Sequence, residues 1–133
     1  MLKVPTFLAP SPIHGVGVHA GVPISAGTVI WEFDSPVDLE IPREDMAAIP
    51  EPYQSRFRHF SYLDESGVYV LCGDNARFMN HSFEPNCDDT GATTVAARDI
   101  AAGEELTCDY RSFDAESRGR EPDALAEELR AAG

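Results

Sequence analysis

Residues 77–87 read RFMNHSFEPNC, a stretch that is typical of neither a helix nor a strand. Its Asn, Ser and Pro residues favour turns, because such side chains compete with the backbone for hydrogen bonds or fix its angles. Asn80, His81 and Ser82 form a polar cluster beside apolar Phe78 and Met79. Burying such a cluster is costly unless each polar group finds a partner. The residues alone leave two interpretations open, a well-bonded structural turn or part of a functional site.

Short apolar runs on both sides of this stretch predict a mainly β domain. Runs of five or six residues, rich in Val, Ile, Thr and Tyr and punctuated by Pro and Gly, are expected to be strands at 16–20, 28–33, 67–71, 93–98 and 105–110. Residues 24–27 (ISAG) are similar to residues 100–103 (IAAG), and each is expected to be a turn that leads into a strand. Four residues are too few to indicate an internal repeat.

Helical signals are confined to a central segment and the C-terminal tail. Residues 42–49 open with a proline at a plausible first helical position and end before Pro50, whereas residues 51–60 are ambiguous. Residues 123–132 are rich in Ala, Leu, Glu and Arg, and Leu125 and Leu129 lie one helical turn apart. The sequence therefore predicts one domain over residues 1–113 with a helical insert at about 38–60, followed by a helical tail over residues 114–133.

Charge and length limit the classes of molecule that this chain is expected to bind. A chain of 133 residues is one ordinary domain, and its formal charge of −13 with only ten Lys and Arg argues against direct binding of nucleic acid. A basic protein or peptide would be attracted, although the charge could equally serve solubility alone. No apolar run approaches the roughly 20 residues that cross a bilayer, and the first ten residues do not resemble a secretory signal. We therefore expect no membrane contact and a cytoplasmic location, with a nuclear one left open.

Three segments together resemble the SET-domain family of protein-lysine methyltransferases. Residues 77–86 are similar to the family signature Arg-Phe-x-Asn-His-Ser-x-x-Pro-Asn, and residues 103–110 (GEELTCDY) are similar to its second signature, Gly-Glu-Glu-Leu-Thr-x-Asp-Tyr. Residues 11–20 (SPIHGVGVHA) are similar to its opening Gly-x-Gly segment. The resemblance implies a β-clip-like SET fold of short strands, in which a pseudoknot joins the two signatures. It also implies transfer of a methyl group from S-adenosylmethionine to a lysine side chain of a protein substrate.

The resemblance further implies roles for individual residues. Tyr110 is expected to be the catalytic residue, although outside this motif it would be an ordinary strand aromatic. The cofactor is expected to lie against His14, Gly15, Val16, Gly17, Phe60, Tyr62, Asn80, His81 and Tyr110. The channel for the substrate lysine is expected to be lined by Tyr62, Cys108, Tyr110 and Phe113. Phe60, Tyr62 and Phe113 could equally be residues that only pack the core.

The chain also departs from the family pattern. Phe83 stands where many relatives carry a zinc-binding cysteine, and no cysteine follows Cys108, so no metal is expected. The tail over residues 114–133 is then expected either to close the peptide cleft or to form the interface of a homodimer. Cys108 occupies a position that controls the number of methyl groups in the family, and its small side chain favours more than one. The alternative from another class is a catalytically inactive SET-fold module that binds basic peptides.

Overall fold

The computed structural model describes residues 1–117, and within them the fold is mainly β. Its strands are β1 (Thr6–Pro10), β2 (Val16–Ala20), β3 (Val29–Trp31), β4 (Leu39–Pro42), β5 (Ser61–Leu63), β6 (Val68–Leu71), β7 (Asn80–His81), β8 (Cys87–Asp88), β9 (Thr94–Ala96) and β10 (Thr107–Cys108). Its helices are α1 (Arg43–Ala48), α2 (Tyr53–Phe60) and the 3-10 helices η1 (Asn75–Phe78) and η2 (Tyr110–Ser112). The tail helix expected over residues 123–132, with Leu125 and Leu129, lies outside the described residues.

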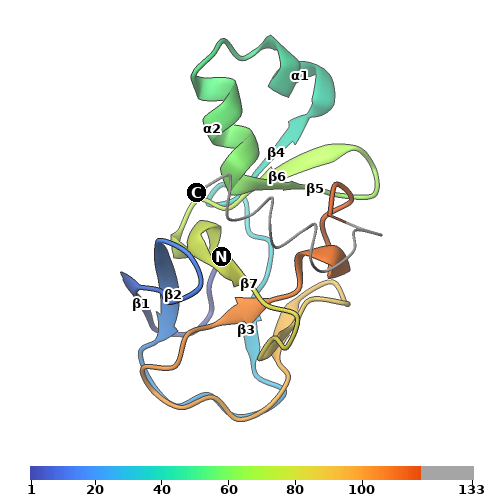
Figure 1. Ribbon diagram of the computed structural model, residues 1–133. Coiled ribbons are helices and arrows are strands. Elements are labelled where there is room, and N and C mark those ends of the chain that lie inside the picture. The colour runs from blue at the N-terminus through green and yellow to red at the C-terminus, as the bar shows by residue number, and fades with distance from the viewer. Residues whose placement is uncertain (118–133) are drawn as a thin grey trace.

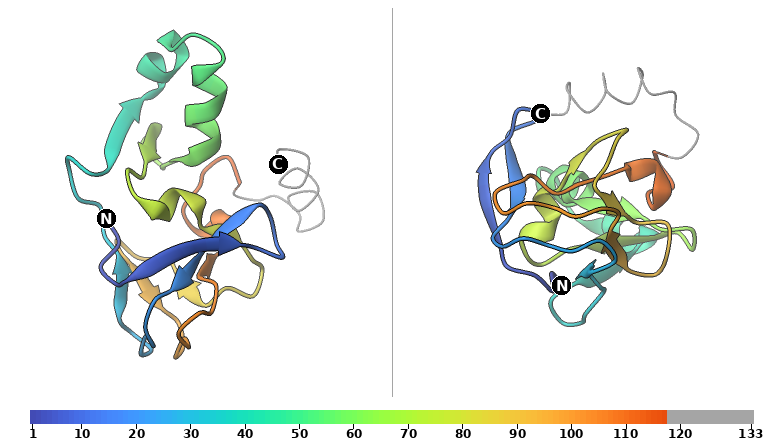
Figure 2. Two further views of the ribbon diagram at one scale, coloured as in Figure 1. Left: turned by 90° about the vertical axis from the view of Figure 1, so that its left-hand side faces the viewer. Right: turned by 90° about the horizontal axis from the view of Figure 1, so that it is seen from below.

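The strands form several small sheets. β1 and β2 make an antiparallel hairpin, β7 and β10 pair in parallel, and two three-stranded sheets have the orders β3-β9-β8 and β4-β6-β5. In Figure 1, α1 and α2 lie with the β4-β6-β5 sheet at one end of the molecule, and the hairpin, β3 and β7 lie at the other. Figure 2 shows the same division from the side, with the hairpin running across the molecule below the helices. Because the strands are so short, the fold depends on pairings between segments that are distant in sequence.

Apolar side chains form two separate cores. The smaller core packs Met46 of α1 against Leu63 and Tyr69 of the adjoining sheet. The larger core lies at the other end, and its most deeply buried members are Val18, Ile30, Ile100 and Leu106. Burial of Met46 holds a helix that would be too short to be stable by itself in water.

The two similar tetrapeptides lie against each other. Ile24 and Ile100 exchange backbone hydrogen bonds of 2.8 Å in both directions. Gly27 and Gly103, which end the tetrapeptides, have φ angles of 84° and 85°, a left-handed conformation that glycine adopts without steric cost. Each tetrapeptide is thus a turn, as predicted, and the pair fixes the chain ahead of the second signature.

The predicted strands and helices agree with the structure in part. The run 16–20 coincides with β2, the runs 28–33, 67–71 and 93–98 contain β3, β6 and β9, and residues 43–48 form α1 as expected. The ambiguous segment 51–60 contains α2. Strands β1, β4, β5, β7 and β8 were not predicted; β4 lies inside the expected helical insert and pairs with β6, and β7 lies in the stretch 77–87 that has the composition of neither a helix nor a strand.

The prediction of a strand through Tyr110 is wrong. Only Thr107–Cys108 pairs as a strand, and Tyr110 begins a 3-10 helix. The side chain of Asp109 accepts a hydrogen bond of 3.0 Å from the backbone of Arg111, which turns the chain at this point. Residues 1–117 include no helix that is long and apolar enough to cross a membrane.

Candidate active site

The two signatures are joined by the parallel pair of β7 and β10. Asn80 lies opposite Thr107 and His81 lies opposite Cys108, and the backbone of Ser82 donates a hydrogen bond of 3.0 Å to the carbonyl of Cys108. Strands of two residues cannot hold such a pairing alone, so side chains must support it. This contact is the one that a pseudoknot between the signatures requires.

Asn86 provides much of that support. Its side chain is almost fully buried, and its amide nitrogen donates to the Glu105 carbonyl at 2.7 Å and to the Glu104 carboxylate at 2.9 Å. Its amide oxygen accepts from the Thr107 backbone at 2.9 Å. An Asn amide can both donate and accept, which a carboxylate cannot do, and this explains the residue type at the crossing.

Asn80 joins both signatures to the Gly-x-Gly segment. Its buried amide nitrogen donates to the carbonyls of His14 and Val16 at 3.0 and 3.1 Å, and to the carboxylate of Glu105 at 3.0 Å. Gly17 is required here, because a Cβ atom at this position would lie 2.4 Å from a carboxylate oxygen of Glu105. Residues 14–17 are therefore fixed beside β7, where the sequence places the expected cofactor loop.

Tyr110 is fixed at both its backbone and its hydroxyl. The backbone nitrogen donates to Nδ1 of His81 at 3.0 Å, and the phenol donates to the carbonyl of Met79 at 2.5 Å. Burial, reinforced by the nearby Cys108, raises the pKa of the phenol above its ordinary value, so the hydroxyl keeps its proton at neutral pH. The ring lies 5.9 Å from that of Phe113, which in turn lies 4.9 Å from that of Tyr62.

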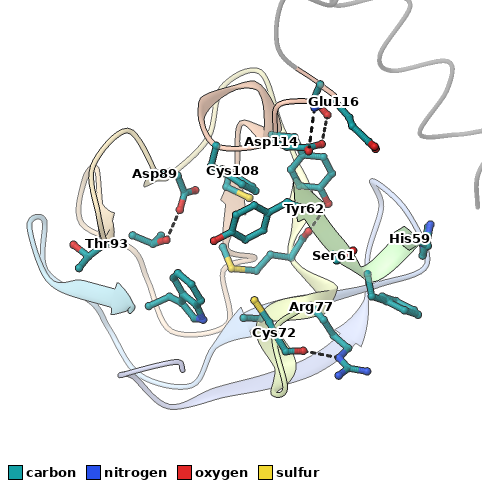
Figure 3. A pocket seen from close by; sticks show the side chains of 18 of the residues that line it. His59, Ser61, Tyr62, Cys72, Arg77, Asp89, Thr93, Cys108, Asp114 and Glu116 are labelled. Atoms are coloured by element: carbon teal, nitrogen blue, oxygen red, sulfur yellow. Dashed lines mark hydrogen bonds between the residues drawn. The ribbon is translucent and has the colours of Figure 1, made fainter. Parts of the chain in front are cut away.

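A cavity of about 240 Å³ collects the expected channel residues. Figure 3 shows this cavity, with Tyr62 and Cys108 near its centre. Tyr62, Cys108, Tyr110 and Phe113 all line it, and so does Phe60. The other expected cofactor residues, His14, Gly15, Val16, Gly17, Asn80 and His81, are not among those that line it. Pockets for whole cofactors are usually about 300–1,000 Å³, so this one suits a side chain better than a nucleoside cofactor.

Sequence reasoning missed several cavity residues. Trp31, Cys72, Met79, Asp89 and Thr94 also line it. Met79 lies inside the first signature, and the position of Asp89 three residues after Asn86, the end of that signature, is the one signal that could have indicated it. The others come from strands and loops whose pairing the sequence did not indicate.

Asp114, Glu116 and Ser117 also line the cavity, and residues 114–117 connect it to α2 and to the β4-β6-β5 sheet. Asp114 accepts a hydrogen bond of 3.0 Å from the backbone of Leu63, and Ala115 donates one of 2.7 Å to the carbonyl of the same residue. Glu116 accepts from the hydroxyl of Tyr69 at 2.9 Å and from Arg58 at 3.2 Å. The start of the tail therefore crosses from Tyr110 to the insert, which the sequence did not predict.

His81 and the cysteines are uncharged in this environment. Burial lowers the pKa of His81, and because its Nδ1 accepts from Tyr110, the ring hydrogen is on Nε2. Burial raises the pKa of the Cys72 and Cys87 thiols to about 12 and that of Cys108 well above its usual range, so these groups are thiols at neutral pH. In the part of the chain that the structure describes, no group of three or more His, Cys, Asp or Glu side chains could hold a metal ion.

This fold and site define a family. A family model described as the SET domain matches residues 15–111, most of the chain, and the chain therefore belongs to the SET-domain family. The matched range includes both signatures and the β7–β10 pair that joins them.

The relatives at sequence level are histone-lysine N-methyltransferases. The chain is 37% identical over 123 residues to the histone-lysine N-methyltransferase trr of Drosophila melanogaster, covering 83% of this chain and 5% of the relative. H3 lysine-4 specific histone-lysine N-methyltransferases from Yarrowia lipolytica and Eremothecium gossypii are 37% and 38% identical, over 82% and 90% of this chain and 10% and 13% of theirs. The chain thus spans only a small part of the length of the relatives that it matches.

Solved structures show the same fold. A humanized mutant of the Chaetomium thermophilum Polycomb Repressive Complex 2, bound to an inhibitor, matches with a TM-score of 0.62 and 22% identity, covering 86% of this chain and 16% of that one. An active polycomb repressive complex 2 in the basal state matches with a TM-score of 0.61 and 20% identity, covering 80% of this chain and 15% of that one. The mainly β SET fold expected from the sequence is confirmed.

Proposed function

We propose that this chain is a protein-lysine N-methyltransferase that uses S-adenosylmethionine. The observation that carries the proposal is Tyr110, whose phenol is fixed on the wall of an aromatic cavity and whose backbone is tied to His81 beside the Gly-x-Gly segment. The names of the sequence relatives, histone-lysine N-methyltransferases, support the same reaction.

The residues near the β7–β10 crossing fit the cofactor. Gly15 has a φ of 47°, and a Cβ atom built there would meet no atom within 4 Å, so the loop presents an open backbone face. His81 follows Asn80, which bonds to this loop, and the Nε2 atom of the buried His81 ring lacks a hydrogen-bond partner among the described residues. We assign His14, Gly15, Val16, Gly17, Asn80 and His81 to the cofactor side, with Phe60, Tyr62 and Tyr110 between cofactor and cavity. When bound, S-adenosylmethionine supplies a methyl group on a positively charged sulfur.

Tyr110 would act by positioning. Its hydroxyl hydrogen is donated to the Met79 carbonyl, so the oxygen lone pairs remain available to orient the reacting groups. Methyl transfer needs the amine nitrogen at about 3–3.5 Å from the methyl carbon, in line with the bond that breaks. No covalent intermediate with the protein is required, and buried thiols such as Cys108 need no nucleophilic role.

The cavity would also prepare the lysine amine. A free lysine has a pKa of about 10.4, so its neutral form is scarce at pH 7. Apolar walls such as Phe60 and Phe113 exclude water and disfavour the ammonium, which lowers the pKa of the amine. Cys108 leaves more room beside the amine than an aromatic residue would, and we propose that more than one methyl group is added.

A basic segment of a protein is the proposed substrate. The chain carries a formal charge of −13, which attracts basic partners and repels nucleic acid. Histone tails are such segments, and the names of the relatives favour them. The cytoplasmic location expected from composition is tested by cell fractionation.

The tail is proposed to close the peptide cleft. Residues 1–113 would be the SET domain, and residues 114–117 support a closing role for the tail because they bond to Arg58 of α2 and to Leu63 and Tyr69 of the adjoining sheet. A homodimer interface is the rival role for the tail. Sedimentation of the full chain and of a chain ending at residue 113 separates the two, because only a dimer interface changes the mass by more than the deleted residues.

Incubation with labelled cofactor and core histones tests the activity. The chain is expected to transfer label to lysine, and Tyr110→Phe is expected to transfer little while still binding the cofactor. If the wild-type chain binds both a basic peptide and the cofactor but transfers no label, the rival function, an inactive peptide-binding module, is correct. Absence of cofactor binding in calorimetry would contradict the proposal as a whole.

A further inference from the structure

Asp89 is a cavity residue without a role in the mechanism above. It follows β8 and lines the same cavity as Tyr110, and Figure 3 shows it on the wall near Cys108. One carboxylate oxygen, Oδ1, accepts a hydrogen bond from the hydroxyl of Thr94. The other, Oδ2, is buried and has no hydrogen-bond partner within residues 1–117. The Cys108 thiol also interacts with this carboxylate, but a thiol is only a weak donor, so Oδ2 is left without a strong one. A buried carboxylate oxygen in that position is costly, so it calls for a ligand.

Neither arginine that lines the cavity forms an ion pair with Asp89. Arg58 is bonded to Glu116, and Nε of Arg77 donates to the Cys72 carbonyl at 3.0 Å. Burial, followed by the neighbouring Asp88, raises the pKa of Asp89, which is the behaviour of a carboxylate that lacks a counter-ion. Asp89 also raises the pKa values of the Cys108 and Tyr62 side chains, so its field reaches the two expected channel residues.

We propose that Asp89 is a specificity-determining residue that holds the nitrogen of the target lysine through an N–H hydrogen bond to Oδ2. This inference rests on the proposed function and adds a named recognition contact to it. The carboxylate attracts the ammonium as it enters the cavity. After the amine loses its proton to water, a remaining N–H still donates to Oδ2, and this directs the lone pair away from Asp89. No bond is made or broken at Asp89.

This contact also predicts which amines the cavity prefers. A primary amine and its mono- and dimethylated forms in the charged state each retain an N–H, whereas a trimethylated ammonium has none. Asp89 therefore favours retention of the first methylated products, for which Cys108 leaves space, and disfavours the trimethylated one. Charge alone does not produce this preference, because the trimethylated form is also a cation.

The single tryptophan of the chain provides an assay that needs neither cofactor nor turnover. Trp31 lines the cavity, and its indole nitrogen is buried without a partner within the described residues, so its one indole N–H signal in an NMR spectrum reports ligand entry. The probes are n-butylammonium, n-butyltrimethylammonium and the neutral 1-butanol, which imitate the end of a lysine side chain. For the wild-type chain, n-butylammonium is expected to bind about tenfold or more tightly than either of the others, as a charge-assisted hydrogen bond implies.

Two variants make the test specific. Asp89→Asn keeps the shape and the contact with Thr94 but removes the charge, and it is expected to abolish the preference for n-butylammonium. Asp88→Asn is the matched control, because it removes the same charge one residue away from an exposed side chain that bonds only to Thr90 among its printed partners, and it is expected to keep the preference.

The outcomes separate this inference from the proposed function. Equal affinities of the wild-type chain for all three probes, or no movement of the indole signal with any of them, would overturn the role of Asp89. The role of Asp89 is also overturned if Asp89→Asn keeps the wild-type preference for n-butylammonium. If Asp89→Asn does not fold, the comparison of n-butylammonium with n-butyltrimethylammonium on the wild-type chain decides. Methylation of histones by the wild-type chain would stand in each of these cases, since it is measured independently.

Discussion

Replacing Asn80 with alanine tests the crossing on which the site depends. The change removes the amide that donates to His14, Val16 and Glu105, and it leaves two backbone carbonyls and one carboxylate oxygen without this donor. Each unsatisfied buried group costs about 1–3 kcal/mol. Water can reach the partly exposed loop, and Glu105 keeps its bonds from Ser11. The free energy of unfolding is therefore expected to fall by the cost of about one unsatisfied group, about 1–3 kcal/mol in total.

The loss is large enough to measure by thermal unfolding. For a domain of this size, 1 kcal/mol changes Tm by about 4 °C, so a fall of about 4–12 °C is expected. The loop at residues 14–17 also loses its anchor, and the affinity for S-adenosylmethionine, measured by calorimetry, is expected to fall about tenfold or more. That factor corresponds to about 1.4 kcal/mol, the lower part of the same range.

Asn86→Ala is the matched control for this variant. Asn86 is at least as deeply buried and also ties the two signatures together, but its hydrogen bonds go to Glu104, Glu105 and Thr107 and not to residues 14–17. It is expected to lower Tm by a similar amount and to affect cofactor affinity much less. If Asn80→Ala leaves both Tm and affinity unchanged, or if the two variants reduce affinity equally, the role given to Asn80 as the anchor of the loop is wrong.

Three further predictions concern the phenol, the tail and the acid limit of stability. Tyr110→Phe removes the hydroxyl that bonds to Met79, so kcat/KM in steady-state assays should fall about 100-fold or more while cofactor affinity stays within about threefold; near wild-type turnover would refute the role of the phenol. Deleting residues 114–133 removes Asp114 and the bonds to Leu63, and it should reduce peptide methylation much more than cofactor binding, whereas equal methylation would show that the tail has no part in the cleft. Burial lowers the pKa of His81, so its contribution to stability is complete above about pH 6.5 and is lost as the pH falls toward the lower pKa of the folded state. Urea unfolding between pH 8 and 5 should show this loss for the wild-type chain and a smaller one for His81→Asn, and identical profiles would contradict it.

Local sequence signals predicted those parts of the fold that depend on neighbouring residues. The helix at 43–48 lies between two prolines, and the turns at Gly27 and Gly103 need a residue that tolerates positive φ. The run 16–20 alternates well enough to give β2 its correct bounds. The two signatures also predicted the family, because their order and spacing carry information that short runs lack.

The strand predicted through Tyr110 shows where local signals fail. Residues 105–110 have the composition of a strand, but β7 offers pairing only to Thr107 and Cys108, and the Asp109 side chain turns the chain next. β4 was missed for the complementary reason, since its pairing partner β6 lies about thirty residues away and nothing local announces it. In both cases the backbone conformation follows from the available partner strand.

The sequence by itself determined the mainly β class, the turns, the first helix and the residue types that meet at the crossing. Only the tertiary structure decided which side chains share the cavity. Asp89 and Trp31 are far apart in sequence and belong to no common motif, yet the sheet in which β9 pairs with both β3 and β8 brings the two into one cavity. Asp114, Glu116 and Ser117 likewise line that cavity, because hydrogen bonds to Leu63 and Tyr69 hold this segment against the β4-β6-β5 sheet. Such contacts follow from pairing between segments that are distant in sequence. The periodicity of apolar residues and the residue types of turns predict single strands and turns, but they do not indicate which strand pairs with which.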